Sequence, residues 1–139
     1  MNKIEYRQGL CFTIEAAKEL YKKSTLAERR PIENEHIFKA MMQNANLLIT
    51  AWCDDQLVGI ARTMTDFAYV AYLADLAVDS SWQGQGIGTE LIQKTREALE
   101  PTCFLTLLSA PKANEFYPKI GFHSHPRAWV LEATLKEKD

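Results

Sequence analysis

The chain has 139 residues, a length that fits one domain and leaves little room for two. Hydrophobic residues make up 47% and charged residues 24%, as in an ordinary globular protein with one sizeable core. The net charge of −2 supplies no positive field, so the charge balance argues against nucleic acid and anionic membrane as partners. We therefore expect a single domain over residues 1–139.

The N-terminal sequence and the hydropathy pattern predict the compartment. The chain begins with polar residues, among them Asn2, Lys3 and Glu5, and does not resemble a secretory signal. No apolar run approaches the roughly 20 residues that are needed to span a bilayer. These features predict a cytoplasmic protein.

The spacing of the cysteines and histidines predicts no metal site. Cys11, Cys53 and Cys103 lie far apart in apolar settings, which is typical of small buried hydrophobic residues. His123 and His125 are two residues apart, but no third candidate ligand is near them in the sequence, and hairpin surface residues are the better interpretation.

Apolar periodicity and turn residues define the elements of the first half of the chain. Thr13 stands where an N-cap is expected, ahead of a helix with one apolar face. Arg29-Arg30-Pro31 interrupts the helical pattern, and Asp54-Asp55-Gln56 predicts a tight turn between two strands. The predicted elements are a strand at 4–7, helices at 14–24 and 34–44, and strands at 47–53, 57–65 and 68–78.

The second half alternates helices and strands. The pattern predicts a helix at 88–99, a mostly apolar strand at 103–108, a short helix at 114–119 ended by Gly121, and two last strands around Pro126, the second at 129–135. The strand–helix–strand order in the middle requires a parallel pair, whereas the short connections before it imply antiparallel pairing. The predicted fold class is α/β, with a mixed, mostly antiparallel sheet of about seven strands and helices on both faces.

A glycine-rich loop separates the third long strand from the helix that follows it. Gln83-Gly84-Gln85-Gly86-Ile87-Gly88 contains three glycines at alternating positions, which allow close approach of the backbone to a ligand and a positive φ. The first turn of the next helix adds unpaired N–H groups and the positive end of the helix dipole. Together these features predict a site for a phosphate or pyrophosphate.

Two common nucleotide-binding motifs do not fit this loop. A Walker loop ends in Gly-Lys-Ser/Thr, but Gly88 is followed by Thr89-Glu90. The dinucleotide fingerprint requires Gly or Ala at position 89 and opens a doubly wound fold, which about fifty remaining residues can hardly build. A glycine-rich turn without a ligand is the structural alternative.

The loop and a second segment resemble the GNAT N-acetyltransferase superfamily. Gln83-x-x-Gly86-x-Gly88, preceded by Asp75-Leu76-Ala77-Val78, is similar to the acetyl-CoA signature of that family. Ala113-Asn114-Glu115-Phe116-Tyr117, just before Gly121-Phe122, resembles the segment that carries the tyrosine facing the leaving thiol. The order of elements matches along essentially the whole chain. The resemblance implies a GNAT-like fold whose fourth strand bulges and splays from the parallel fifth strand, so that pantetheine lies between them.

The resemblance also implies an activity: transfer of an acetyl group from acetyl-CoA to a primary amine of a small molecule or peptide by direct attack. Tyr117 would protonate the leaving sulfur. Homodimers are common in the family, so a homodimer is a further expectation. By their place in the two motifs, the donor-binding residues would be Leu76, Ala77, Val78, Gln83, Gly84, Gln85, Gly86, Ile87, Gly88, Thr89, Asn114 and Phe116.

The general base and the acceptor pocket have no clear motif. Tyr72 stands where some family members carry a glutamate. Asp75 and Asp66 are the nearest carboxylates, although Asp75 also fits a structural role in the sheet, and a water chain to solvent is another route for the proton. The acceptor pocket of the family would be lined here by Arg29, Arg30, Tyr69 and Tyr72, unless the two arginines belong to a solvated loop.

Two other functions remain open alternatives. The absence of an obvious base is consistent with a non-catalytic acyl-CoA-binding sensor or regulatory domain. A member that modifies nucleic acid is disfavoured, because the chain is weakly acidic and shows no stripe of lysine and arginine.

Overall fold

The computed structural model describes residues 3–134, with the side chain of Lys112 excepted. The chain divides into two compact units, Met1–Leu108 and Ser109–Asp139, which we describe separately. Within residues 3–134, no helix combines the length and the apolar character needed to cross a membrane.

The first unit is built on a five-stranded sheet with the order β1-β2-β3-β4-β5. The first four strands pair antiparallel, and β5 pairs parallel to β4. This arrangement confirms the predicted α/β fold with a mixed, mostly antiparallel sheet and a parallel fourth and fifth strand. The strands are β1 (Ile4–Gln8), β2 (Leu47–Cys53), β3 (Gln56–Thr65), β4 (Val70–Val78) and β5 (Phe104–Leu107).

The first two α-helices of this unit begin where the sequence provides a side-chain cap. The Thr13 hydroxyl accepts a hydrogen bond from the N–H of Ala16 at 3.0 Å, and the Asn34 side chain accepts one from Ile37 at 3.1 Å. A 3₁₀ turn that was not predicted, Leu26–Arg29, lies between the first two helices and ends just before the Arg30-Pro31 interruption. The α-helices are α1 (Ile14–Lys23), α2 (Glu35–Gln43) and α3 (Ile87–Glu97).

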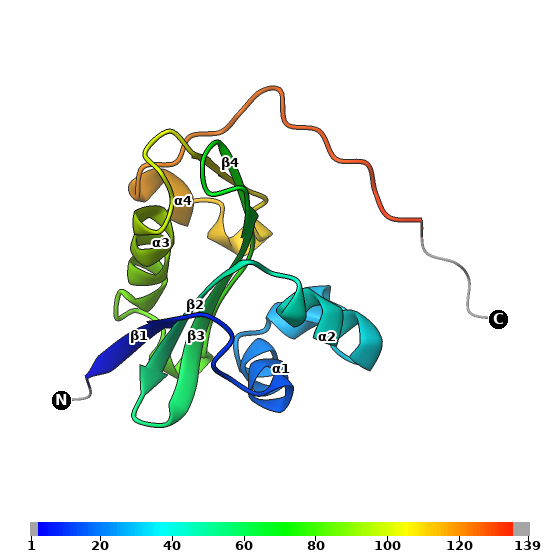
Figure 1. Cartoon of the computed structure of the whole chain (residues 1–139), viewed down its shortest axis with the longest axis vertical. Helices are drawn as coiled ribbons and strands as arrows, with labels where there is room; N and C mark the ends of the chain where they lie inside the picture. Colours follow the sequence, from blue (N-terminus) through cyan, green and yellow to red (C-terminus); the bar gives the residue numbers. More distant parts are fainter. Residues whose placement is uncertain (1–2, 135–139) are drawn as a thin grey trace. The chain divides into compact units, whose positions relative to one another are not determined.

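The helices cover both faces of the sheet, as predicted (Figure 1). Successive residues of a strand point to opposite faces. On β3, Ile60 joins the buried cluster formed with Tyr21 of α1 and Phe38 of α2. Its neighbour Gly59 points toward α3, where a Cβ would come within 3.0 Å of Leu91. The missing side chain at position 59 therefore lets α3 pack directly on the sheet.

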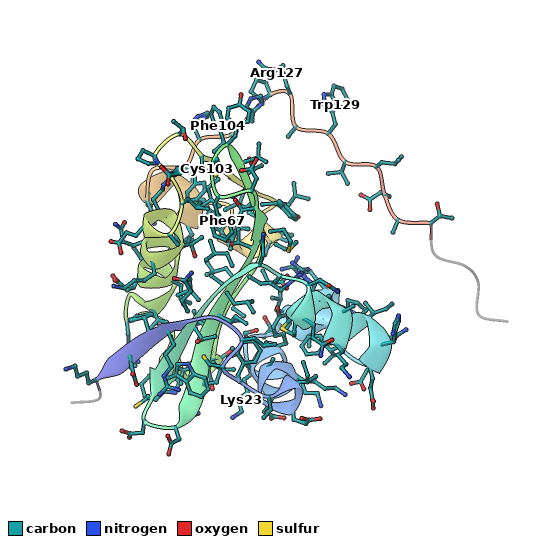
Figure 2. All side chains as sticks on the ribbon, viewed as in Figure 1. Lys23, Phe67, Cys103, Phe104, Arg127 and Trp129 are labelled. Carbon is teal, nitrogen blue, oxygen red and sulfur yellow. The ribbon has the colours of Figure 1, made fainter. Side chains whose placement is uncertain are left out.

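The second unit contains a 3₁₀ turn, Pro111–Ala113, and a short helix, α4 (Phe116–Lys119). Gly121 follows α4 with φ +105°, as predicted for the residue that ends this helix. The two strands predicted around Pro126 are wrong over the described residues, since 122–134 form no strand; Leu135 lies outside them. Alternating side chains favour a strand only when a neighbour pairs with its backbone, and here Trp129, labelled in Figure 2, is 90% exposed.

Candidate functional site

The glycine loop adopts a backbone conformation that other residues rarely take. Gly84 has φ +81° and Gly86 has φ +83°, both in the left-handed region. A Cβ at either position would meet nothing within 4 Å, so the need for glycine comes from the backbone conformation and not from packing. Gly86 is also the N-cap of α3.

The main-chain N–H groups of this loop point away from the protein's own acceptors. The first hydrogen bond of α3 runs from the N–H of Glu90 to the carbonyl of Gly86 at 3.0 Å. Among the residues that the structure describes, none accepts a hydrogen bond from the main-chain N–H groups of residues 83–89. Free donors at the positive end of an 11-residue helix form an anion-binding site.

Two side chains of the loop tie it to the sheet. Gln83 Nε2 donates to the carbonyl of Val78, the last residue of β4, at 3.1 Å. Ile87 is buried and lies in the α3–sheet interface near Gly59. The main chain of residues 83–89, and not these two side chains, is therefore what the loop offers to a ligand.

The parallel pairing of β4 and β5 stops midway along β4. It runs from Val70 opposite Phe104 to Leu73 opposite Leu107. Beyond that point β4 continues to Val78, while β5 has ended. The structure thus confirms the predicted splay of the fourth and fifth strands, and it leaves the far edge of β4 open.

A β-bulge lies at the point where the splay begins. On the other edge of β4, Arg62 pairs with Asp75 and Thr63 pairs with Leu73, so Ala74 is an extra residue without a partner on β3. Past the bulge, Asp79 N–H donates to the Val58 carbonyl at 2.9 Å. The alternation of antiparallel pairing then directs the main-chain groups of Leu76 and Val78 to the open edge and those of Ala77 to β3.

The open edge of β4 is followed by a 3₁₀ turn, Ser80–Trp82, and then by the glycine loop. Of the three β4 residues predicted to bind the donor, Leu76 and Val78 present N–H groups there, whereas Ala77 contributes its buried side chain to the core. The structure therefore places a row of strand donors next to a cluster of helix N-terminal donors. This arrangement suits a long ligand with a polar amide arm and an anionic group.

A cluster of buried charged and polar side chains contacts β4 on the sheet face that α1 and α2 cover. Most of this cluster was not predicted from the sequence. Asp75 Oδ2 accepts hydrogen bonds from the Tyr21 hydroxyl at 2.5 Å and from Arg62 Nε at 2.5 Å. Asp75 Oδ1 accepts one from Arg30 Nε at 2.6 Å. A signal was present: Asp75 and Arg62 each stand in the middle of an apolar strand, where a charge must be paired.

These contacts argue against Asp75 as the general base. Burial by itself would raise the pKa of Asp75, but the charge and hydrogen bond of Arg62, the Tyr21 hydroxyl and the charge of Arg30 outweigh it and lower the pKa below its ordinary value. Both carboxylate oxygens already accept from these donors. A carboxylate with a lowered pKa is a weak base, so the geometry favours the structural role for Asp75.

Asp66 is also engaged within its own turn. Its Oδ1 accepts from the N–H groups of Tyr69 at 2.7 Å, Ala68 at 2.9 Å and Val70 at 3.1 Å. These backbone hydrogen bonds, with that of Tyr69 the largest, lower the pKa of Asp66. Neither carboxylate that the sequence suggested is therefore well suited to accept a proton from an amine.

We expect Asp75→Asn to destabilise the protein by about 3 kcal/mol at pH 7, because it leaves the buried guanidinium of Arg62 and the partly buried one of Arg30 without their anion. The native pKa of Asp75 is lowered, so its contribution is present above the unfolded pKa of about 3.9 and is lost as pH falls through the native value. The difference in unfolding free energy between wild type and Asp75→Asn should therefore shrink at pH 3. Urea unfolding at both pH values measures it, and equal stability at pH 7 would contradict the structural role.

Asp66→Asn is the matched control for this substitution. An asparagine can still accept hydrogen bonds from the N–H groups of its turn. It should therefore cost less stability than Asp75→Asn in the same urea series, although both variants lose one carboxylate, the first from the turn between β3 and β4 and the second from β4.

Of the residues predicted on the acceptor side, some have exposed side chains and one is held in an ion pair. Tyr72 pairs with Met64, and the sulfur of Met64 lies 3.7 Å from Arg62 Nη1, so Tyr72 lies on the sheet face that α1 and α2 cover. Tyr69 is exposed and packs edge-on against Phe104, labelled in Figure 2, at 5.6 Å between ring centroids. Arg29 is exposed, whereas Arg30 is held by Asp75 and is no free cation.

The residues of the second predicted motif lie in the second unit. The Tyr117 ring packs edge-on against Phe116 at 5.1 Å and against Phe122 at 5.5 Å. The Asn114 side chain accepts a hydrogen bond from the Ser109 hydroxyl at 3.1 Å. Their roles toward acetyl-CoA stay predictions from the motif.

The cysteines and histidines of residues 3–134 differ in burial. In that part of the chain, no three His, Cys, Asp or Glu side chains come together in a way that could hold a metal. Cys103 is buried as expected, whereas Cys11 is exposed and lies 3.7 Å from the Thr50 hydroxyl.

Curated relatives of this chain are acetyltransferases. The chain is 37% identical over 73 residues to "Histone acetyltransferase TAP1" of Glycine max, a match that covers 51% of this chain and 32% of the soybean protein. It is 30% identical over 123 residues to "Uncharacterized N-acetyltransferase ycf52" of Pyropia yezoensis, covering 86% of this chain and 64% of that protein. The chain spans about a third of the length of the first curated relatives that it matches.

Solved structures share the fold. A probable acetyltransferase from Meticillin-Resistant Staphylococcus aureus superposes with a TM-score of 0.76 at 22% identity, covering 96% of this chain and 100% of the other. An aminoglycoside N-acetyltransferase in complex with CoA gives a TM-score of 0.73 at 17% identity, with 97% of each chain covered. A family model described as "Acetyltransferase (GNAT) domain" matches residues 15–131, which include the splayed strands, the glycine loop and the Tyr117 segment. This chain therefore belongs to the GNAT acetyltransferase family.

Proposed function

We propose that this protein transfers an acetyl group from acetyl-CoA to a primary amine of a small molecule or peptide. One observation carries the proposal: the free N–H groups of residues 83–89 follow the open edge of β4 in the chain, after one 3₁₀ turn at Ser80–Trp82. A pyrophosphate fits the loop, because Gly84 and Gly86 leave open space around their Cα atoms. The amide-containing arm of CoA fits the strand edge, where the main-chain N–H groups of Leu76 and Val78 are available, although the Val78 carbonyl already accepts from Gln83.

The chemistry requires few protein groups. The amine nitrogen attacks the thioester carbon, the new C–N bond forms, and the C–S bond breaks. Main-chain N–H donors along the open edge of β4 would stabilise the negative charge that develops on the carbonyl oxygen. Tyr117 would deliver a proton to the leaving sulfur, and the amine would lose its proton to solvent through water, because Asp75 and Asp66 are both engaged.

The acceptor is proposed only as a class. The relatives and structural neighbours include a histone acetyltransferase, a glucosamine 6-phosphate N-acetyltransferase and an aminoglycoside acetyltransferase. These names indicate that the acceptors of those proteins are amines. Tyr69, Tyr72 and Arg29 are the exposed side chains that we propose on the acceptor side. A cytoplasmic location, a homodimer, and the absence of nucleic acid, membrane and metal from its function are further proposals from the charge balance and the family.

A second candidate is a domain that binds acyl-CoA without turning it over. The engagement of both nearby carboxylates favours it, since a sensor needs no base. Binding and turnover separate the two functions, and the same protein sample serves for both measurements.

We expect acetyl-CoA at about 100 times its dissociation constant to raise the unfolding free energy by about 2.7 kcal/mol, because it binds only the folded state. Thermal unfolding with and without acetyl-CoA measures the shift, and a thiol reagent measures CoA release with a panel of amines. Stabilisation with thiol release supports the acetyltransferase. Stabilisation without thiol release on any amine supports the sensor, and no stabilisation contradicts both.

A further inference from the structure

Arg30 binds the bulge of β4 and the residue after it at the same time. Its Nη2 donates to the carbonyl of Ala74 at 3.0 Å, and its Nε donates to Asp75 Oδ1 at 2.6 Å. Its Nη1 donates to the carbonyl of Arg29 at 2.9 Å, which fixes the guanidinium to its own segment. A planar guanidinium can hold two adjacent acceptors in a fixed geometry in this way, which a single point charge cannot.

The contacts of Arg30 fall at the position where β4 leaves β5. Leu73 is the last residue of β4 that pairs with β5, Ala74 is the bulge, and Asp75 is the residue anchored by the cluster. Leu76 is then the first residue whose main chain faces the open edge. The anchored residues therefore separate the paired half of β4 from the half that offers free N–H groups.

Side chains of α1 and β3 bind the other carboxylate oxygen of Asp75. Tyr21 of α1 and Arg62 of β3 hold its Oδ2, and Arg62 Nη1 reaches the carbonyl of Met41 in α2 at 3.3 Å. Arg62 contacts the carboxylate and α2, whereas Arg30 contacts the carboxylate and the bulge carbonyl. The two arginines therefore have different contacts. Arg62 joins the sheet to the helices, and Arg30 holds the main chain of β4 at the bulge.

A strand that pairs with a neighbour on one side only needs other contacts to fix its backbone. Beyond Leu73, no strand within residues 3–134 pairs with β4 on its β5 side, so β3 is its only strand neighbour there. The side chains of Arg30 and Gln83 supply the other hydrogen bonds to its main chain. Bulged residues bend the strand and can shift register when nothing fixes them. An ion pair with one fully buried partner, here Asp75, is costly to disrupt, so the pair with Arg30 fixes one arrangement of the bulge.

We propose that Arg30 is a positioning residue for the acyl donor: by holding the Ala74 carbonyl and Asp75 together, it fixes the bulge that aims the Leu76 and Val78 main chain at the arm of acetyl-CoA. This inference rests on the proposed function, because it assigns Arg30 a role in binding that donor. In this role, Arg30 does not contact the donor itself.

The test compares Arg30→Met and Arg30→Lys with wild type, using two ligands. Acetyl-CoA spans the β4 edge and the glycine loop, whereas ADP carrying a 3′-phosphate can occupy only the loop. We expect Arg30→Met to weaken acetyl-CoA binding about tenfold, the effect of losing about one main-chain hydrogen bond from the misplaced edge of β4, and to change the affinity of the nucleotide by less than about twofold. Arg30→Lys keeps the positive charge but lacks the planar guanidinium. Its affinity for acetyl-CoA should therefore lie between those of wild type and Arg30→Met.

Arg7→Met is the matched control. Arg7 also forms an ion pair, with Glu5 at 3.0 Å, and also packs on a neighbour, 4.4 Å from the Trp52 ring centroid. It lies on β1, at the opposite edge of the sheet from the bulge. Its removal should leave both affinities unchanged. Hydrogen exchange of the Ala77 amide, which faces its partner Ile60 on β3, adds a readout without ligand, and exchange should be faster in Arg30→Met than in Arg7→Met.

The outcomes separate this inference from the proposed function. If wild type binds neither ligand, the proposed function fails and the donor role of Arg30 fails with it. If wild type binds both and the folded Arg30 variants match it, only the positioning role is overturned. Equal weakening of both ligands would also overturn it, because that result indicates general destabilisation. If Arg30→Met does not fold, Arg30→Lys carries the same comparison.

Discussion

Gly86→Ala is expected to weaken acetyl-CoA binding by about a hundredfold or more. Gly86 has φ +83° as the N-cap of α3, and an alanine in the left-handed region costs about 1–2 kcal/mol. The chain can relieve this strain only by rotating the loop, which turns the N–H groups of residues 83–89 away from the pyrophosphate. Loss of two such charge-assisted hydrogen bonds corresponds to about 3 kcal/mol, or somewhat more than a hundredfold in affinity.

Gly9→Ala provides an unusually close control for this prediction. Gly9 also has a positive φ, +108°, and a Cβ there would also meet nothing within 4 Å. The two variants therefore carry similar backbone strain, but Gly9 lies after β1, outside the glycine loop. Calorimetric titration with acetyl-CoA on both variants measures the difference. Equal affinities in Gly86→Ala and wild type would remove the loop from donor binding.

Tyr117→Phe is expected to lower kcat by about 10²–10⁴-fold, the usual contribution of a positioned proton donor. Without the hydroxyl, the thiolate must leave unprotonated, so the step that breaks the C–S bond slows. The affinity for acetyl-CoA should change little, because the ring still packs on Phe116 and Phe122. Thiol release under saturating acetyl-CoA and amine measures kcat, and titration measures the affinity.

Tyr6→Phe is the control for loss of a phenol. Tyr6 lies on β1, outside both motifs, and its removal should leave kcat unchanged. A Tyr117→Phe variant with wild-type kcat would take Tyr117 out of the chemistry, and a variant that loses affinity instead of turnover would make it a binding residue. Both results would leave the donor loop as the basis of the proposed function.

Local signals in the sequence were sufficient for most of the fold. Thr13 caps α1 as predicted, because an N-cap hydrogen bond depends only on residues three apart. Gly84 and Gly86 take positive φ, and Gly121 ends α4, because glycine alone enters that region without cost. The strand–helix–strand order was sufficient for the parallel pair of β4 and β5, since chain connectivity permits no other pairing.

Long-range contacts decided the rest. The sequence by itself determined the glycine loop with its positive φ angles and the family resemblance, since both rest on residues close together in the chain. Only the tertiary structure showed that Asp75 is held in an ion-pair cluster, because its partners Tyr21, Arg30 and Arg62 come from three distant segments. The same reason explains the strands that were predicted after Gly121 but did not form: alternation is a local property, whereas a strand exists only where another segment pairs with it.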